Sequence, residues 1–496
     1  MRTFWTTFLF LFFLLSLYQS CFGSDAPPIS DKTKTCLSCH NTIHPGIVED
    51  WQTSRHSHNT PKQSQQVQGL AKRISSSDIP KNLQKVTVGC AECHTLSPKT
   101  HKDSFSHAGF QVHTVVTPKD CALCHRQETE QYARNIMSFA RKNLNQNPVY
   151  QDLQRTIHGT IIEDKTKIGF QPANDFTRAE SCYYCHGTQL LVTGNKTRKT
   201  SMGPMQFPII KGWPNQGSGR VNPDKSKGSC TACHTRHAFS IAEARKPYTC
   251  KECHIGPDVP AYKVYSASKH GNIFFAKVNS WNFSKVPWTV GQDFTAPTCA
   301  VCHMSLTVDK NGQVIAKRSH NMGTRLSWRI FGLIYAHPHP SEPDTTKLKN
   351  SAGLNLPTEL NGQPIENGLI DPTQQKTRKN RMQAVCKACH GSSWVNNHWQ
   401  RLQNTITQSN KAVKAATESM SAIWEKGLAQ QNKSLFNEAI EKKWSNIWLI
   451  NANKIRFASA MAGGGDYGVF AQGRFALSKK IKEMEDWFLI HQQISQ

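Results

Sequence analysis

The chain has 496 residues, too many for one compact core, and this length predicts two or three domains. Apolar residues make up only 38% of it and the mean hydropathy is −0.54, so aliphatic side chains alone would form a thin core. The 60 lysines and arginines exceed the 34 aspartates and glutamates, which gives a formal net charge of +26. An aromatic content of 9% argues against a disordered chain, and a single long apolar run argues against a membrane protein with several spans.

The N-terminus has the pattern of a secretory signal peptide. Arg2 precedes an apolar run over residues 4–18, and small residues follow at Cys21 and Gly23. The run has about 15 residues, fewer than the roughly 20 that a membrane-spanning helix needs. We expect cleavage after Gly23, so that residues 1–23 are a signal peptide and the mature protein is periplasmic. The alternative is a lipoprotein acylated at Cys21, which is disfavoured because the three residues before it are a poor sequence for lipidation.

The cysteine pattern carries the strongest signal. Cys21 is one of 17 cysteines, and the other 16 form eight C-x-x-C-H motifs. This motif attaches c-type haem, because the two thiols bond to the porphyrin and the histidine ligates the iron. A disulfide scaffold would not repeat one spacing eight times, and zinc sites would join cysteine pairs into fours without a histidine after each. The sequence therefore predicts eight covalent haem c groups. The motifs are Cys36/Cys39/His40, Cys90/Cys93/His94, Cys121/Cys124/His125, Cys182/Cys185/His186, Cys230/Cys233/His234, Cys250/Cys253/His254, Cys299/Cys302/His303 and Cys386/Cys389/His390.

Eight haems account for both oddities of the composition. Each porphyrin is a large apolar plate on which side chains pack, so the cofactors supply part of the core. The haems also bring about 16 propionates, which reduce the +25 of the mature chain to about +9. Much of the basic excess is therefore expected to pair with these carboxylates, and the rest to steer an acidic redox partner. Nucleic-acid binding is disfavoured because the basic residues form no single block.

Histidines outside the motifs are numerous enough to supply a second ligand to each iron. Methionine ligands would raise the haem potentials, but methionine more often fills gaps in packing, so bis-histidine ligation is favoured. A haem without a second ligand would be open to a substrate. The 14 candidates are His44, His56, His58, His101, His107, His113, His158, His237, His270, His320, His337, His339, His398 and His491.

The chain divides into two regimes after the leader. No proline follows Pro372, which favours long helices in the last part of the chain. In the first part, the gap of 20 residues between Cys230 and Cys250 predicts neighbouring haems. We expect an octahaem domain over residues 24–395 and a C-terminal three-helix domain over residues 396–496. The fold class is mainly α, a multihaem cytochrome c fold with a loop-rich haem domain and little strand.

The C-terminal domain shows helical periodicity. Apolar residues recur at helical spacing over residues 402–428, 435–461 and 470–488. A run of glycines at residues 463–465 separates the second helix from the third. This pattern predicts three long helices that pack on the haem domain or on another subunit.

The eight motifs, their spacing and the helical tail resemble the hydroxylamine oxidoreductase family of octahaem cytochromes. The resemblance implies that the fourth haem, on Cys182, Cys185 and His186, is five-coordinate and catalytic, and that the other seven relay electrons. It implies the second ligands His56, His107, His158, His237, His270 and His320, and leaves a seventh unassigned. The matching stretches are residues 42–56, 115–120, 236–240, 256–258, 268–271 and 319–321.

The resemblance also implies a homotrimer. In some members a tyrosine from a neighbouring subunit is bonded to the catalytic porphyrin, and Tyr467 is the positional candidate; an ordinary aromatic at a helix start is the alternative. One departure concerns the Asp-His pair that the oxidising enzymes carry after the sixth motif. Here Asp258 is followed by Val259, and valine cannot exchange protons as histidine does. The departure disfavours efficient oxidation and favours reduction of nitrite or hydroxylamine.

Two functions stay open at this point. The first is a periplasmic oxidoreductase that acts on small nitrogen compounds at an open fourth haem, by oxidation of hydroxylamine or hydrazine or by reduction of nitrite or hydroxylamine. Its redox partner would be a cytochrome or a quinone-linked protein. The second is a non-catalytic electron-transfer conduit in which every iron has two histidine ligands.

Overall fold

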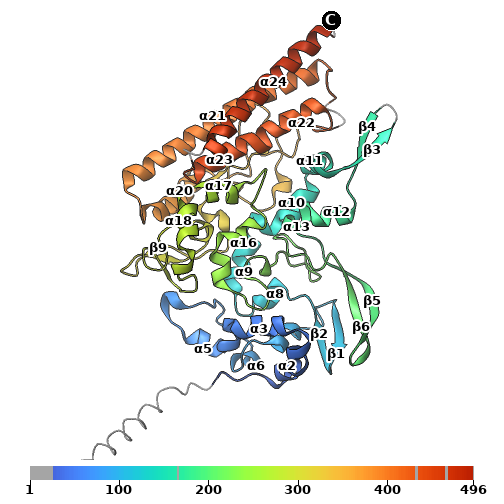
Figure 1. Cartoon of the computed structure of the whole chain (residues 1–496), viewed down its shortest axis with the longest axis vertical. Helices are drawn as coiled ribbons and strands as arrows, with labels where there is room; N and C mark the ends of the chain where they lie inside the picture. Colours follow the sequence, from blue (N-terminus) through green and yellow to red (C-terminus); the bar gives the residue numbers. More distant parts are fainter. Residues whose placement is uncertain (1–25, 165–166, 431–433, 464–466, 495–496) are drawn as a thin grey trace, which may run out of the picture.

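The computed structural model describes residues 26–164, 167–430, 434–463 and 467–494. The expected signal peptide, residues 1–23, and Cys21 lie outside these ranges, as do residues 464–466 of the glycine-rich break. Within the described ranges, no helix is both long and apolar enough to cross a membrane. The chain is mainly α-helical, with helices joined by long irregular segments (Figure 1). This confirms the expected fold class.

The motif-bearing part of the chain is built from short helices. Each motif lies on or beside about one helical turn, because residues at i and i+3 share a helix face and the next residue follows them closely. Three of these helices, α7, α13 and α19, consist of one motif each. The helices here are α2 (Asp31–Ile43), α3 (Pro45–Thr53), α4 (Arg55–His58), α5 (Pro61–Gln66), α6 (Lys81–Gln84), α7 (Cys90–His94), α8 (Pro118–Cys121), α9 (Arg126–Ala133), α10 (Ala140–Gln146), α11 (Pro148–His158), α12 (Asp175–Glu180), α13 (Cys182–His186), α14 (Thr231–His234), α15 (Ile241–Arg245), α16 (Pro247–Lys251), α17 (Ala261–Ala267), α18 (Lys269–Lys277), α19 (Cys299–His303) and α20 (Pro372–Lys387).

Small antiparallel hairpins add to this helical frame. The longest, β5 (Leu191–Thr200) with β6 (Gly203–Lys211), projects along one edge of the molecule (Figure 1). Both of its faces are largely exposed, so its sequence lacks the alternation that would have predicted a strand. The other strands are β1 (Ser104–His107) with β2 (Phe110–His113), β3 (Thr160–Asp164) with β4 (Lys167–Gln171), the three-stranded β7 (Trp288–Thr289), β8 (Thr307–Val308) and β9 (Val314–Ala316), and β10 (Trp328–Arg329) with β11 (His337–Pro338).

Three helical segments form the C-terminal part, as the periodicity predicts. The first is α21 (Ser392–Glu425); the second joins α22 (Ala439–Asn446), a π-helical turn (Ile447–Ala452) and α23 (Asn453–Ala460); the third joins a turn at Tyr467–Ala471 to α24 (Gln472–Ile494). They lie side by side at one end of the molecule (Figure 1). α21 ends before the expected residue 428, because Gly427 adopts a left-handed conformation with φ of +69°.

The aliphatic core is concentrated in these C-terminal helices. Their largest buried cluster includes Met420, Trp444 and Trp448, each with no exposed surface. Near the N-terminus, by contrast, one buried cluster contains only Ile74, Ile79 and Leu83. At about 25 cal/mol per Å² of buried apolar surface, so small a cluster adds little stability to the loops around it. The apolar surface of bound porphyrins would fill this deficit.

Candidate haem centres and the surroundings of the fourth motif

The cysteines of the motifs are chemically available for haem attachment. All 16 described cysteines carry free thiols. Several thiols of different motifs hydrogen-bond to one another: Cys36 with Cys90, Cys121 with Cys230, and Cys185 with Cys253. These contacts place the first motif beside the second, the third beside the fifth, and the fourth beside the sixth. A further thiol contact, between Cys250 and Cys299, places the sixth motif beside the seventh.

Two of the predicted haem-attaching cysteines, Cys39 and Cys389, are exposed, whereas the other motif cysteines are partly buried. Cys39 belongs to the first motif and lies on α2. Its Sγ lies 3.8 Å from Oγ of the neighbouring Ser38. Cys39 is exposed because α2 lies at the surface, and Thr33 is the one buried residue of this helix. The second thiol of the first motif is therefore reachable from solvent, and its bond to a porphyrin stays a prediction.

Five of the six expected second ligands face a motif histidine. With a metal–imidazole bond of about 2 Å and a ring nitrogen about 1 Å from the ring centre, two imidazoles on opposite sides of one iron have centres about 6 Å apart. The observed pairs match this spacing, so the donor sets fit haem irons. The ring-centre distances are 6.1 Å for His40–His107, 6.5 Å for His94–His237, 6.3 Å for His56–His125, 6.3 Å for His234–His320 and 6.1 Å for His270–His390.

Burial keeps these imidazoles in the form that binds metals. Burial is the main cause that lowers the pKa of His56, His234 and His320, each to about 4. A neutral ring retains a lone pair for a metal, whereas a protonated ring does not. These three rings are therefore neutral donors near neutral pH.

The sixth expected ligand, His158, lies elsewhere. Its Nε2 is 3.0 Å from Sγ of Cys182, at the fourth motif. Three motif histidines, His186, His254 and His303, have no ring contact with any of the six expected ligands in the described chain. His337 and His339 are both buried, and the ring of His339 lies against Gly323 in the turn Met322–Arg325, which contacts α19 of the seventh motif.

α10 and α11 border the fourth motif on one side. Nδ1 of His186 is 3.2 Å from the carbonyl oxygen of Ala140 at the start of α10, and burial lowers the pKa of His186. The Tyr183 hydroxyl donates to Oδ1 of Asn145 at 3.0 Å. Gly187 follows the motif with a φ of +89°. A Cβ added at this residue would lie only 2.2 Å from the amide nitrogen of Arg220. This close approach of two backbones fixes the end of α13.

Three polar side chains from separate elements lie around the fourth motif. Asp258 is within electrostatic range of Cys182 and His186. The Arg329 guanidinium on β10 lies near the Tyr150 hydroxyl of α11 and near His186. Burial raises the pKa of Tyr150, so its hydroxyl stays protonated. A cation, a hydroxyl and a carboxylate are thus gathered beside one motif, and only Asp258 among them was expected from the sequence.

The remaining expected site residues lie away from this cluster. Val259 packs into an apolar cluster with Val264 and Phe457. Tyr467, at the start of the third C-terminal segment, is 78% exposed. An exposed side chain at this position is free to contact another molecule.

Two buried arginines donate their hydrogen bonds to neutral oxygens. Arg245 donates to the carbonyls of Phe283 and Lys285, and Arg456, with no exposed surface, donates to Ser409, Asn410 and Asn453. Neither guanidinium forms an ion pair with a described carboxylate. Burial lowers the pKa of each to about 9, which records the cost of an unpaired buried charge. Such cations suit the propionates that a bound haem would bring.

Comparison with known proteins points in the same direction as this geometry. A family model described as seven times multi-haem cytochrome CxxCH matches residues 218–332, and a model of cytochrome c554 and c-prime matches residues 30–116. A solved structure described as a hypothetical multiheme protein is 39% identical, with a TM-score of 0.88, over 95% of this chain and 98% of that one.

Two proteins of Kuenenia stuttgartiensis are also similar. Its reducing HAO-like protein complex, where HAO stands for hydroxylamine oxidoreductase, shares the fold at 19% identity, with a TM-score of 0.62 over 94% of this chain and 86% of that one. A probable nitrite reductase-hydroxylamine oxidoreductase fusion protein is 26% identical over 370 residues, 73% of this chain; the chain spans 34% of that protein's length. The chain belongs to the multihaem c-type cytochromes and is similar to hydroxylamine oxidoreductase-like proteins.

Proposed function

We propose that this protein is an exported octahaem oxidoreductase that acts on small nitrogen compounds at the fourth motif. The observation that carries the proposal is the contrast between motif histidines. Five face a second imidazole at the spacing of a closed iron, whereas in the described chain His186, His254 and His303 do not. Among these three, His186 is chosen because Asp258, Arg329 and Tyr150 are gathered around the fourth motif. An iron at His186 with one open position would bind the nitrogen of a substrate and exchange electrons with it.

The remaining seven motifs form the relay in this proposal. The Cys185–Cys253 contact supports transfer between the fourth and sixth haems, and the Cys250–Cys299 contact supports transfer on to the seventh. For the seventh haem, on His303, we assign His339 as second ligand because it lies against the turn that contacts α19. Electrons would enter or leave the catalytic haem through the sixth.

We assign reduction as the direction. Nitrite takes up six electrons and eight protons to give ammonium and two waters, and a low-potential cytochrome or quinone-linked protein would supply the electrons. Arg329 suits an anionic substrate, because a guanidinium binds an oxyanion through charge-assisted hydrogen bonds. Tyr150 would hold a proton beside the substrate, and Asp258 would place a carboxylate there. Val259 supports the same direction, since it packs among apolar side chains and supplies no base for oxidation.

Binding of small ligands to the purified holoprotein tests the enzyme proposal. We expect nitrite, hydroxylamine and cyanide each to change the absorbance of one haem of the eight. Absorbance that stays unchanged for all three ligands would contradict an open iron.

The second candidate, a non-catalytic electron conduit, rests on His158. Its Nε2 lies 3.0 Å from Sγ of Cys182, so this imidazole is near enough to the fourth motif to close its iron. His158→Ala discriminates between the two candidates. In the conduit, only the variant would bind cyanide; in the enzyme, the wild type binds it as well.

The cellular setting follows from the same proposal. We place the mature chain, freed of residues 1–23, in the periplasm. We also propose a homotrimer in which Tyr467 reaches the catalytic haem of a neighbour and α24 lies at the subunit contact. Exposed apolar side chains on α24, Phe475, Leu489 and Ile490, support a contact there, since each exposes more than half of its surface.

A further inference from the structure

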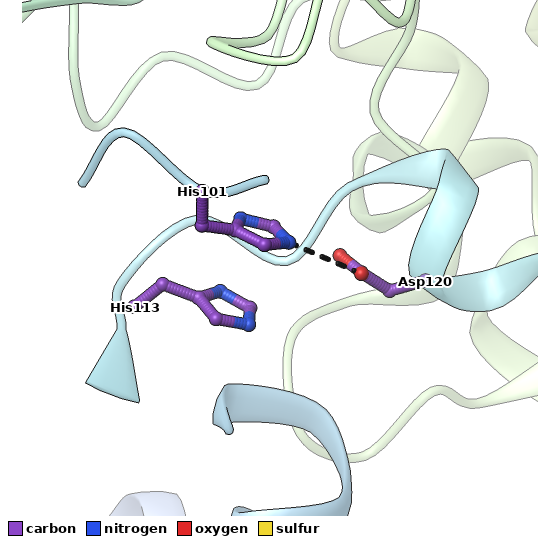
Figure 2. Close-up of side chains that lie close together, drawn as sticks. All are labelled: His101, His113 and Asp120. Carbon is purple, nitrogen blue, oxygen red and sulfur yellow. Dashed lines mark hydrogen bonds and ion pairs between the residues drawn. The ribbon is translucent and has the colours of Figure 1, made fainter. Parts of the chain in front are cut away.

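Buried polar side chains are held differently beside the motifs and in the C-terminal helices. Beside the second motif, His101 and His113 stack with their ring centres 3.5 Å apart, next to Asp120 (Figure 2). The surroundings of these groups include the haem that we expect at the second motif. In contrast, Asn453 and Arg456 on α23 have no exposed surface, so the chain itself encloses them. All their polar contacts are therefore with other residues of this chain.

The side-chain amide of Asn453 joins two segments that border the fourth motif. Its Oδ1 accepts from the backbone amide of Gly332 at 2.9 Å, and its Nδ2 donates to the backbone carbonyl of Asp258 at 3.3 Å. Oδ1 also accepts from Nη1 of Arg456 at 3.1 Å, and Nδ2 also donates to the carbonyl of Leu449 at 2.7 Å. An asparagine amide has two acceptor sites and two donor hydrogens. All four are used here, which fixes the orientation of the amide.

A second amide, on α21, holds the other end of one of these segments. Oδ1 of Asn410 accepts from the backbone amide of Ala336 at 3.1 Å, and its Nδ2 donates to the carbonyl of Ala336 at 2.8 Å. Gly332 and Ala336 both lie in the connection between β10 and β11, where Arg329 pairs with His337. Helices α21 and α23 therefore hold both ends of the connection that follows Arg329.

The cation between these two amides has no carboxylate partner among the described residues. Arg456 donates to Oδ1 of Asn453 at 3.1 Å and to Oδ1 of Asn410 at 2.7 Å. Burial lowers the pKa of Arg456 to about 9, so the guanidinium stays protonated near neutral pH. An aspartate in place of either asparagine would pair with this charge and offset part of the cost of burying it. An ionised aspartate, however, has no hydrogen to donate to the backbone carbonyls that the amides hold.

We propose that Asn453 and Asn410 are positioning residues for the reaction at the fourth motif, held in place by Arg456. This inference rests on the proposed function, because the groups that they position are Asp258 and Arg329. Asn453 holds the backbone of Asp258 directly, and the two asparagines together hold the connection after Arg329. Groups that act on a substrate need support from locked, hydrogen-bonded neighbours, and a local cost in stability is expected where such support matters. The amides beside an unpaired guanidinium are such a cost.

The substitution Asn453→Asp separates positioning from stability. The new carboxylate keeps oxygens for Gly332 and Arg456 and pairs with the guanidinium, but it loses both donor hydrogens and so releases the carbonyl of Asp258. Steady-state reduction of nitrite and hydroxylamine by holoprotein is measured together with the melting temperature. Because a small displacement of a reacting group costs up to about 100-fold in rate, we expect kcat to fall at least about 10-fold for both substrates. The KM for nitrite should change less than about threefold, since Gly332 stays held on the side of Arg329.

Ser459→Ala is the matched control, because it removes a buried hydrogen bond between the same two helices. The Ser459 hydroxyl on α23 donates to Oγ1 of Thr405 on α21 at 3.1 Å, instead of to either segment at the fourth motif. We expect this variant to keep the wild-type kcat and KM, and to melt no higher than Asn453→Asp. Equal losses of activity in both variants would show that Asn453 acts through stability alone and would overturn the proposal. Wild-type kinetics in Asn453→Asp would overturn it as well.

Asn410→Asp is the second variant, and it decides if Asn453→Asp does not fold. It releases the carbonyl of Ala336 but keeps oxygens for the amide of Ala336 and for Arg456. We expect the Kd of nitrite, from the haem absorbance of the holoprotein, to rise about 10-fold and that of uncharged hydroxylamine less than about threefold, because Arg329 binds the anion. An unchanged Kd for nitrite would overturn the role of the two asparagines. A wild type that neither binds nor reduces nitrite would instead refute the proposed function, and this inference with it.

Discussion

The substitution Arg329→Gln is expected to lower kcat/KM for an anionic substrate at the fourth motif more than for a neutral one. The guanidinium is half-buried and lies near both Tyr150 and His186. A hydrogen bond to a charged group contributes about 1.5–3 kcal/mol. Taking about 2 kcal/mol for a half-buried site, loss of the charge lowers kcat/KM for nitrite about 30-fold. Hydroxylamine is uncharged near neutral pH, so its kcat/KM is expected to change less than about threefold.

The assay is steady-state reduction of both substrates by holoprotein supplied with a chemical reductant. Arg155→Gln is the matched control, since it removes an exposed arginine from the same helix as Tyr150 and leaves the fourth motif untouched. Equal losses for nitrite and hydroxylamine would show that Arg329 acts through structure. No loss for nitrite would refute its assignment to anion binding.

Further predictions concern the helical bundle, the subunit contact and the departure after the sixth motif. Trp444→Ala removes a fully buried side chain that donates to Thr417, so the free energy of unfolding should fall by about 3–5 kcal/mol in thermal melts. The exposed Phe176→Ala should lower it by less than about 1 kcal/mol, and equal effects would contradict the assigned core. Tyr467→Phe should give subunits that separate on denaturation with ordinary haem c absorbance; wild-type subunits that already do so would remove the cross-link. Val259→His places an imidazole among apolar side chains, so we expect a lower Tm and no gain in hydroxylamine oxidation, and a clear gain would show that a base was limiting.

Local patterns account for the features that could be read from the sequence. C-x-x-C-H places two thiols and an imidazole within about one turn, so no distant residue is needed to identify a haem site. The C-terminal helices were predictable because one face of each is buried in an apolar cluster, which imposes helical spacing on residues such as Val413 and Met420. The β5–β6 hairpin was missed because neither of its faces is buried and no alternation results.

The second ligands and the exposure of each thiol could not be predicted from local sequence patterns alone. His320 faces His234 across 86 residues of sequence, and such a pair is joined only when the chain folds. Family resemblance implied the six second ligands but not their partners. Five of them face a motif histidine, whereas His158 lies at Cys182. Likewise, the motif identifies Cys39 as a haem cysteine but does not reveal that its side chain is exposed, because that depends on the position of α2 at the surface.

By itself, the sequence determined the chemistry of this protein: a multihaem c-type cytochrome with a helical tail, because thiols, imidazoles and apolar periodicity are written in short spacings. The tertiary structure decided which side chains meet. It brought Arg329 to Tyr150 beside the fourth motif, and it joined His101, His113 and Asp120 from three elements with no shared spacing. The physical reason is that convergence depends on how loops pack around buried polar groups, and each such group must find a partner wherever the fold places one.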